Sequence, residues 1–152
     1  MIRDQLSDAL KTSMKEKKQV AVSTLRLIQA AIKDRDIAAR SKGVDDGISD
    51  EEILQVLQTM VRQRHDSIEM YTKGNRDELA EREAQEIEVI QGFMPRQLDD
   101  AEMEAAIDQV VDATGAASIK DMGKAMGALR ERYAGQMDFG KAGAVLKARL
   151  AG

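Results

Sequence analysis

Apolar residues recur at helical spacing along almost the whole chain. The first stripe repeats every four residues and comprises Ile2, Leu6, Leu10 and Met14. A stripe of this spacing places its members on one face, so it predicts a helix over about residues 2–17. Further stripes predict a second helix after Lys18, a long third helix after Ser49, a fourth helix after Asn75 and three shorter helices beyond Pro95.

Helix starts and stops are marked by local signals. A Ser, Asp or Asn stands three residues before an acidic residue at four places, the spacing of a capping box. These pairs are Ser49 with Glu52, Asn75 with Glu78, Asp99 with Glu102, and Ser118 with Asp121. Asp138 is expected to begin a last helix, and glycines at 74, 115 and 135 are expected to end the helices before them. The short turn around Gly74 predicts an antiparallel helical hairpin.

The predicted fold class is all-α, because no segment alternates apolar and polar residues between hairpin turns. Pro95 is the only proline, and proline interrupts a helix because it lacks a backbone N–H and clashes with the preceding turn. We therefore predict two domains: an N-terminal bundle of about four longer helices over residues 1–95, and a smaller three-helix C-terminal unit over residues 96–152. Apolar Phe93, Met94 and Leu98 predict a packed joint at this break.

Composition narrows the functional classes. The 152 residues include no cysteine, which excludes disulfides and thiolate chemistry, and only 3% are aromatic. No apolar run reaches the roughly 20 residues that a membrane-spanning helix needs. The N-terminus lacks the apolar core of a signal peptide. We expect a soluble, cytoplasmic protein without a membrane partner.

Charge is unevenly distributed although the net charge is only −4. Residues 116–152 carry seven Lys or Arg and three acids, which gives 7 − 3 = +4. Residues 96–115 carry one Arg and six acids, which gives 1 − 6 = −5. Two interpretations stand side by side: solvated helix faces of opposite sign, or a docking surface for a polyanion.

Two glycine patterns near the C-terminus suggest chemistry. Residues 135–141 match the first seven positions of a phosphate-binding loop, G-x-x-x-x-G-K, but Ala142 follows where Ser or Thr would bind magnesium, and no strand precedes. We interpret this stretch as a plain connection in which Gly140 permits close helix approach. Gly123 and Gly127 share a helix face, and we favour close helix–helix contact there, with close approach of an RNA backbone beside Lys124 as the alternative.

The sole histidine, His65, stands near Arg62 and Arg64 in a possible polar cluster. Its spacing places it on or beside the apolar stripe, so we favour a hydrogen-bonded residue at the core edge over a ligand. The same-face pair Glu83 and Glu86 is interpreted as part of a solvated face. We identify no catalytic set, no metal site and no cofactor.

Several blocks together resemble the GatB/YqeY family, which is related to the tail of the B subunit of the tRNA-dependent amidotransferase. The blocks are the opening helix from Leu6 to Met14, residues 24–33 (TLRLIQAAIK), residues 62–69 (RQRHDSIE) with Tyr71, residues 94–98 (MPRQL) and residues 120–127 (KDMGKAMG). The resemblance covers nearly the whole chain and implies two helical units.

The resemblance also implies a function, since the tail helps to hold the tRNA while other parts of the amidotransferase perform the amidation. We therefore expect a non-catalytic tRNA-associated helper, with an amidotransferase or aminoacyl-tRNA synthetase complex as a further partner. The expected RNA-binding residues are Lys120, Lys124, Arg130, Arg132, Lys141 and Lys147. A protein–protein adaptor is the alternative, and carbon–nitrogen ligase activity, which the family label suggests, is a minor one.

Overall fold

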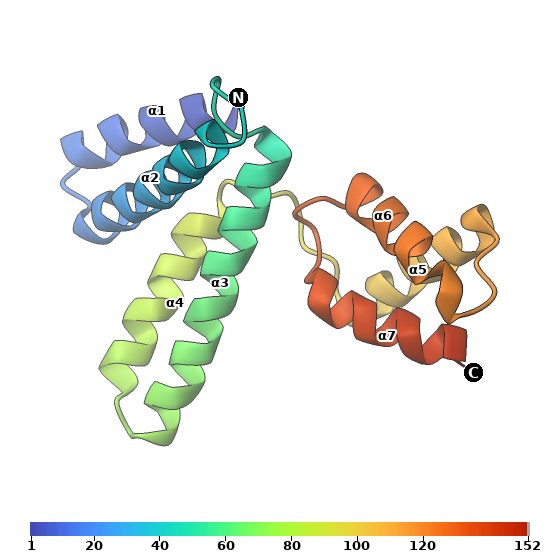
Figure 1. Ribbon diagram of the computed structural model, residues 1–152. Coiled ribbons are helices and arrows are strands. Elements are labelled where there is room, and N and C mark those ends of the chain that lie inside the picture. Colours follow the sequence, from blue (N-terminus) through green and yellow to red (C-terminus); the bar gives the residue numbers. More distant parts are fainter. Residues whose placement is uncertain (152) are drawn as a thin grey trace. The chain divides into compact units, whose positions relative to one another are not determined.

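The computed structural model describes residues 1–151, in which seven α-helices and one short 3₁₀-helix form the regular structure (Figure 1). The described part contains no strand, so the predicted all-helical fold is confirmed. Contacts between Cα atoms divide the chain into two compact units, Met1–Met94 and the part from Pro95 onward. No helix in residues 1–151 has both the length and the hydropathy to cross a membrane.

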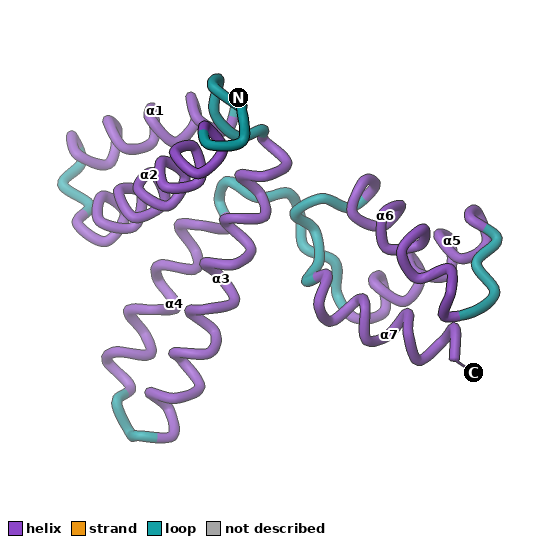
Figure 2. The backbone as a smooth tube through the Cα atoms, viewed as in Figure 1, coloured by secondary structure: helices purple, strands orange, loops and turns teal. Residues whose placement is uncertain are grey.

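The longer helices belong to the N-terminal unit: α1 (Ile2–Lys15), α2 (Gln19–Arg40), α3 (Asp50–Lys73) and α4 (Asp77–Gln91). The C-terminal unit holds α5 (Asp100–Thr114), the 3₁₀-helix η1 (Ile119–Asp121), α6 (Met122–Arg132) and α7 (Phe139–Ala151). Loops and turns connect these helices (Figure 2).

The core of the N-terminal unit forms where α2 packs against α1 and α4, and where α3 and α4 pair as the predicted hairpin. On α3 the buried stripe is Ile53, Val56, Leu57 and Met60, the i, i+3, i+4, i+7 spacing of an amphipathic helix. The core cluster takes α3 residues only up to Val61. The far end of the α3–α4 hairpin therefore lies outside this core.

Capping residues fix several helix ends as predicted. Ser49 Oγ accepts a hydrogen bond from the Glu52 N–H at 3.2 Å. Asp99 and Glu102 form a full capping box, with bonds of 2.8 and 3.2 Å. Gly115 ends α5 with φ +67°, the left-handed conformation that glycine adopts without a steric cost.

The predicted cap at Asn75 is wrong. Asn75 has φ +56°, so it occupies a left-handed turn position, and Arg76 is the N-cap of α4 without a side-chain cap bond. The physical reason is the tight α3–α4 turn, which needs a left-handed residue directly after Gly74. Asparagine tolerates that conformation better than most residues.

A loop clasp, formed by Arg3, Asp36 and Ile48, fastens the α2–α3 loop to α1 and α2. The Arg3 guanidinium donates to both Asp36 carboxylate oxygens at 2.9 and 2.7 Å. The Ile48 N–H donates to Asp36 Oδ1 at 2.9 Å, and Arg3 Nη2 donates to the Ile48 carbonyl at 3.2 Å. These donors lower the pKa of Asp36, with the Arg3 hydrogen bond as the largest cause.

The C-terminal unit has its own core, which includes Ile107, Val110, Leu129, Met137 and Leu146. The segment after Pro95 is held by backbone bonds within this unit, because the Leu98 N–H donates to the Gln136 carbonyl at 2.8 Å. Phe93 and Met94 pack against the N-terminal core and Leu98 against the C-terminal core. These residues are thus divided between the two cores, and the packed joint expected at this break stays a prediction.

Candidate nucleic-acid interface

The outward side of α6 is defined by the residues that its opposite side buries. Ala125, Met126 and Leu129 are buried in the C-terminal core. At about 100° per residue, Gly123 and Gly127 then lie on the outward side, and both are exposed. Before α6, the Asp121 carboxylate accepts the N–H groups of Ala117 and Ser118 at 2.8 and 3.2 Å, so the helix begins near the predicted Ser118 start.

Cations stand on both flanks of this glycine face. Lys124 and Arg130 are roughly 120° apart around the helix axis, with Gly123 and Gly127 between them. Lys120 precedes Lys124 by four residues, across the 3₁₀ turn. All three cations are exposed, and none forms an ion pair with a described residue.

One acid interrupts the same side. Glu131 is exposed and falls between Arg130 and Lys124 around the axis. Lys124 also acts on Asp121, whose pKa is lowered chiefly by the two backbone donors and to a smaller extent by this lysine.

The glycines face open space. A Cβ added at Gly123 or at Gly127 meets no described atom within 4 Å other than the neighbouring backbone of α6 itself. The favoured expectation of close helix–helix contact is therefore wrong, because the apolar residues of α6 turn its other side to the core. The two glycines leave a shallow strip of exposed helix backbone between the cations, and another backbone can approach this strip closely.

The other predicted cations do not join this strip. Arg132 lies roughly 160° from Arg130 around α6, on the opposite flank. Lys141 forms an ion pair with Asp100, with 2.7 Å between Nζ and Oδ1. Lys147 is exposed on α7 and forms no ion pair with a described residue. Binding roles for all six residues stay predictions.

The stretch that resembles a phosphate-binding loop is a capped helix start. Asp138 Oδ1 accepts the N–H groups of Gly140 and Lys141 at 2.8 and 3.4 Å, so a carboxylate already satisfies the amides of the first turn of α7. Gly140 does not serve close helix approach, since the atom nearest to an added Cβ is Asp138 Oδ1 at 3.2 Å. The expectation for Gly140 is wrong because this residue lies in the first turn of α7, directly against the Asp138 carboxylate that caps it.

The structure separates the members of the predicted polar cluster on α3. Arg62 and His65 are exposed, so His65 does not lie at the core edge. Arg64 instead lies against α4, where its Nε donates to Glu86 Oε2 at 3.1 Å. The three side chains therefore do not converge on one point, since Arg64 lies roughly 160° from Arg62 around the helix.

Glu86 is the residue whose role the sequence did not reveal. Its side chain is 13% exposed and that of Arg64 12%, so the solvated-face interpretation is wrong for this position. Arg82 Nε also lies 3.6 Å from Glu86 Oε1. The pKa of the neighbouring Glu83 is raised, chiefly by burial and secondarily by the charge of Glu86. The pairing depends on the register of the α3–α4 hairpin, which is a long-range feature.

The comparisons with known proteins agree with the resemblance. The family model described as "Yqey-like protein" matches residues 3–150, which confirms the expected family. Curated relatives carry the name "Altered inheritance of mitochondria protein 41, mitochondrial". The relative from Lachancea thermotolerans is 31% identical over 108 residues, 70% of this chain and 56% of the relative. That from Vanderwaltozyma polyspora is 27% identical over 124 residues, 77% of this chain and 64% of the relative.

Two facts limit and correct the expectations. This chain spans only about half to two thirds of the length of these relatives, at 56% and 64%. The cytoplasmic location expected from the sequence is contradicted, because the relatives are named as mitochondrial proteins. Composition could not reveal this location, since the absence of cysteine does not distinguish the two compartments.

Proposed function

Since this chain belongs to the YqeY-like protein family, we propose that it is a non-catalytic helper that docks on tRNA through the outward side of α6. The contacts are Lys120, Lys124 and Arg130. The observation that carries the proposal is the exposed strip at Gly123 and Gly127, with unpaired cations on both flanks.

Physical chemistry supports a nucleic-acid ligand for this strip. Lys and Arg contacts to phosphate position a backbone without reading its sequence. Each contact releases counterions, so affinity depends steeply on salt. The missing Cβ atoms at Gly123 and Gly127 allow a sugar–phosphate backbone to approach the helix between the cations.

The test is a titration of fluorescently labelled tRNA with the full chain at several salt concentrations. Three phosphate contacts predict that log K falls against log salt with a slope of roughly −2 to −3. The double variant Lys124→Glu with Arg130→Glu removes two contacts, so it should lower affinity and reduce the slope by roughly 1.5 to 2.

A matched control changes the net charge by the same amount elsewhere. Lys11→Glu with Lys42→Glu reverses two exposed cations of the N-terminal unit that form no ion pair with a described residue. This control should keep its affinity for tRNA. A salt-independent affinity, or equal losses in the two double variants, would rule out docking on α6.

The partners and location follow from the same proposal. We place the role in the mitochondrion, the location in the names of the curated relatives. An amidotransferase or an aminoacyl-tRNA synthetase complex would present the tRNA. A ligase activity would require the purified chain to convert misacylated tRNA with glutamine and ATP, and we expect no conversion, because the sequence motifs predict no catalytic set.

The alternative of a protein adaptor loses the support that Met60, Met122 and Met126 were expected to give it. Met60 and Met126 are 7% and 8% exposed, and Met122 packs against the C-terminal core. They are core residues and do not form an exposed adaptable stripe. Pull-down before and after nuclease treatment distinguishes the two functions, because a protein partner retained after nuclease is not bridged by RNA.

A further inference from the structure

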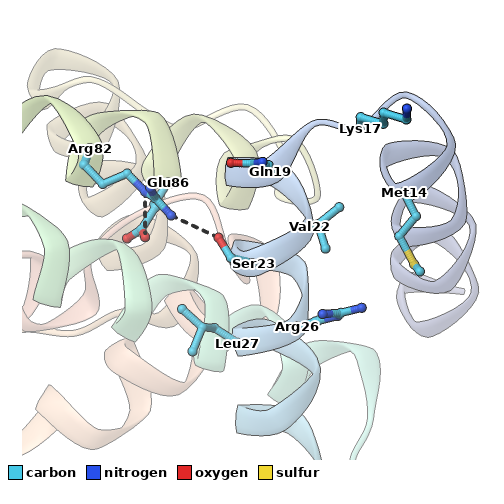
Figure 3. Close-up of a pocket in the computed structure, with 9 residues that line it drawn as sticks. All are labelled: Met14, Lys17, Gln19, Val22, Ser23, Arg26, Leu27, Arg82 and Glu86. Carbon is cyan, nitrogen blue, oxygen red and sulfur yellow. Dashed lines mark hydrogen bonds and ion pairs between the residues drawn. The ribbon is translucent and has the colours of Figure 1, made fainter.

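A second surface, in the N-terminal unit, combines exposed apolar side chains with positive charge. It is a groove of about 800 Å³ whose floor is the outward side of α2 and whose flanks are α1 and α4. Figure 3 shows α2 between Met14 and Lys17 at the end of α1 and Arg82 and Glu86 on α4. The surface lies within one unit.

The apolar part of the groove is unusually open to solvent. Met14 and Leu27 are 51% and 48% exposed, and Val22 lies between them on the floor. Ile37 continues this side of α2 about five turns beyond Gln19 and is 52% exposed. Exposed apolar side chains gathered in one groove mark an interaction site more often than isolated ones do.

The groove is lined by more cationic than acidic side chains. Lys17 and Arg26 line it and form no ion pair with a described residue. Arg82 is held in place, because its Nη2 donates to Ser23 Oγ at 3.1 Å. The one acid, Glu86, is nearly buried and paired with arginines, so the rim that a ligand meets is positive.

The position of Lys17 is fixed by the backbone. It has φ +58°, a left-handed conformation that is uncommon for any residue with a side chain. The turn is closed by bonds from the Lys17 N–H to the Met14 carbonyl at 3.2 Å and from the Lys18 N–H to the Ser13 carbonyl at 3.0 Å. A glycine would suit this turn better, yet the chain places a cation at the rim.

We propose that this groove binds an acidic amphipathic helix of a partner protein. The apolar face of that helix contacts Met14 and Val22 on the α1 side of the groove and Leu27 on the α4 side, and its carboxylates meet Lys17, Arg26 and Arg82. The part of α2 that lines the groove, from Gln19 to Leu27, is about 12 Å long, which matches about two turns of a partner helix. This is helix-in-groove recognition, in which anchors at i, i+3, i+4 and i+7 give affinity and flanking charge gives specificity.

The test uses a synthetic, fluorescein-labelled helical peptide of about 18 residues, with leucines on one face and glutamates on the other. Fluorescence anisotropy with the full chain should give saturable binding that weakens as salt rises. Arg26→Glu and Leu27→Ser should each weaken binding at least about tenfold. Lys17→Gly removes a cation while relieving the left-handed backbone, so a loss of binding in this variant does not reflect unfolding.

Matched controls change the same chemistry outside the groove. Arg62→Glu reverses an exposed, unpaired cation on α3, and Met70→Ser removes a side chain that is 73% exposed near the end of α3. Both should bind the peptide like the parent chain. Equal weakening in the controls, equal binding of a peptide with scrambled leucines, or no binding at all would overturn the proposal.

Other occupants give different results. Concentration-dependent sedimentation of the unliganded chain that Leu27→Ser abolishes would show a second copy in the groove and overturn the proposal. Binding to vesicles of anionic lipid without binding to the peptide would identify a membrane surface instead. A loss of tRNA binding in Arg26→Glu would reassign the groove to nucleic acid.

Discussion

The loop clasp should be a main source of local stability in the N-terminal unit, and replacing Asp36 by alanine tests this. The substitution removes the acceptor of the Ile48 N–H and the partner of Arg3. Ile48 is 6% exposed, so its N–H would be left without a partner away from water, at a cost of about 1–3 kcal/mol. The Arg3 side chain is 39% exposed, so the lost ion pair adds only about 0.2–1 kcal/mol.

Alanine favours the helix more than aspartate does, so a control is needed. Asp34→Ala makes the same change two residues earlier on α2, at an exposed side chain without an ion pair to a described residue. Subtracting its effect leaves an expected loss of about 1–4 kcal/mol for Asp36→Ala. Urea denaturation followed by far-UV circular dichroism measures both free energies of unfolding. A difference below about 0.5 kcal/mol would refute the reasoning, because ordinary surface substitutions fall in that range.

Asp36 also determines how the stability of the N-terminal unit changes with pH. The pKa of Asp36 is lowered in the folded state, so its contribution is fully present above the unfolded value, about 3.9. The contribution is lost as pH falls through the lowered folded value. The stability difference between the parent chain and Asp36→Ala should therefore shrink at acid pH, and a difference that grows on acidification would contradict the clasp.

Three further changes have definite expected outcomes. Gly47→Ala places a Cβ 2.7 Å from the Arg3 guanidinium at φ +89°, whereas Gly43→Ala at φ +87° meets nothing within 4 Å. Thermal denaturation should therefore show a larger loss of stability for Gly47→Ala. Equal losses of stability in the two variants would mean that the guanidinium moves aside freely. The pKa of Glu102 is lowered to about 2, chiefly by the hydrogen bond from Arg96. Arg96→Met should return this pKa toward its ordinary value, which an NMR titration of the carboxyl carbon measures. An unchanged pKa would assign the shift to the capping bond. Leu129→Ala opens a cavity at a fully buried position and should cost about 2–5 kcal/mol by urea denaturation, and a cost under about 1 kcal/mol would mean that the core collapses around it.

Helix boundaries could be predicted because capping is a local property. Ser49, Asp99 and Gly115 act on residues within four positions of themselves, and all three end or begin helices as expected. Asn75 failed because the same residue type suits both an N-cap and a left-handed turn, and the hairpin geometry decided between them. Local signals of this kind can be overridden only by the surrounding turn.

The polar interactions between helices could not be predicted. Arg64 meets Glu86 across 22 positions and Arg3 meets Asp36 across 33, so each pair depends on helix register. The outward face of α6 could be predicted from the sequence, since Ala125 and Leu129 define its buried side and leave the glycines on the outward side. Treating glycine pairs as packing sites led the interpretation away from that face.

The α3–α4 hairpin extends past the core that holds the rest of its unit, since that core takes α3 only up to Val61 and α4 only from Val89. Between those points the two helices rely on each other, on the Arg64–Glu86 pair and on the bond from Arg82 to Ser23 of α2. Amide hydrogens near the Gly74 turn should consequently exchange with solvent through local fraying. Those of Ile53 and Leu57 should exchange only when the whole unit unfolds. Limited proteolysis would then cleave the chain first at that turn, while the parts of α3 and α4 that pack in the core stay intact.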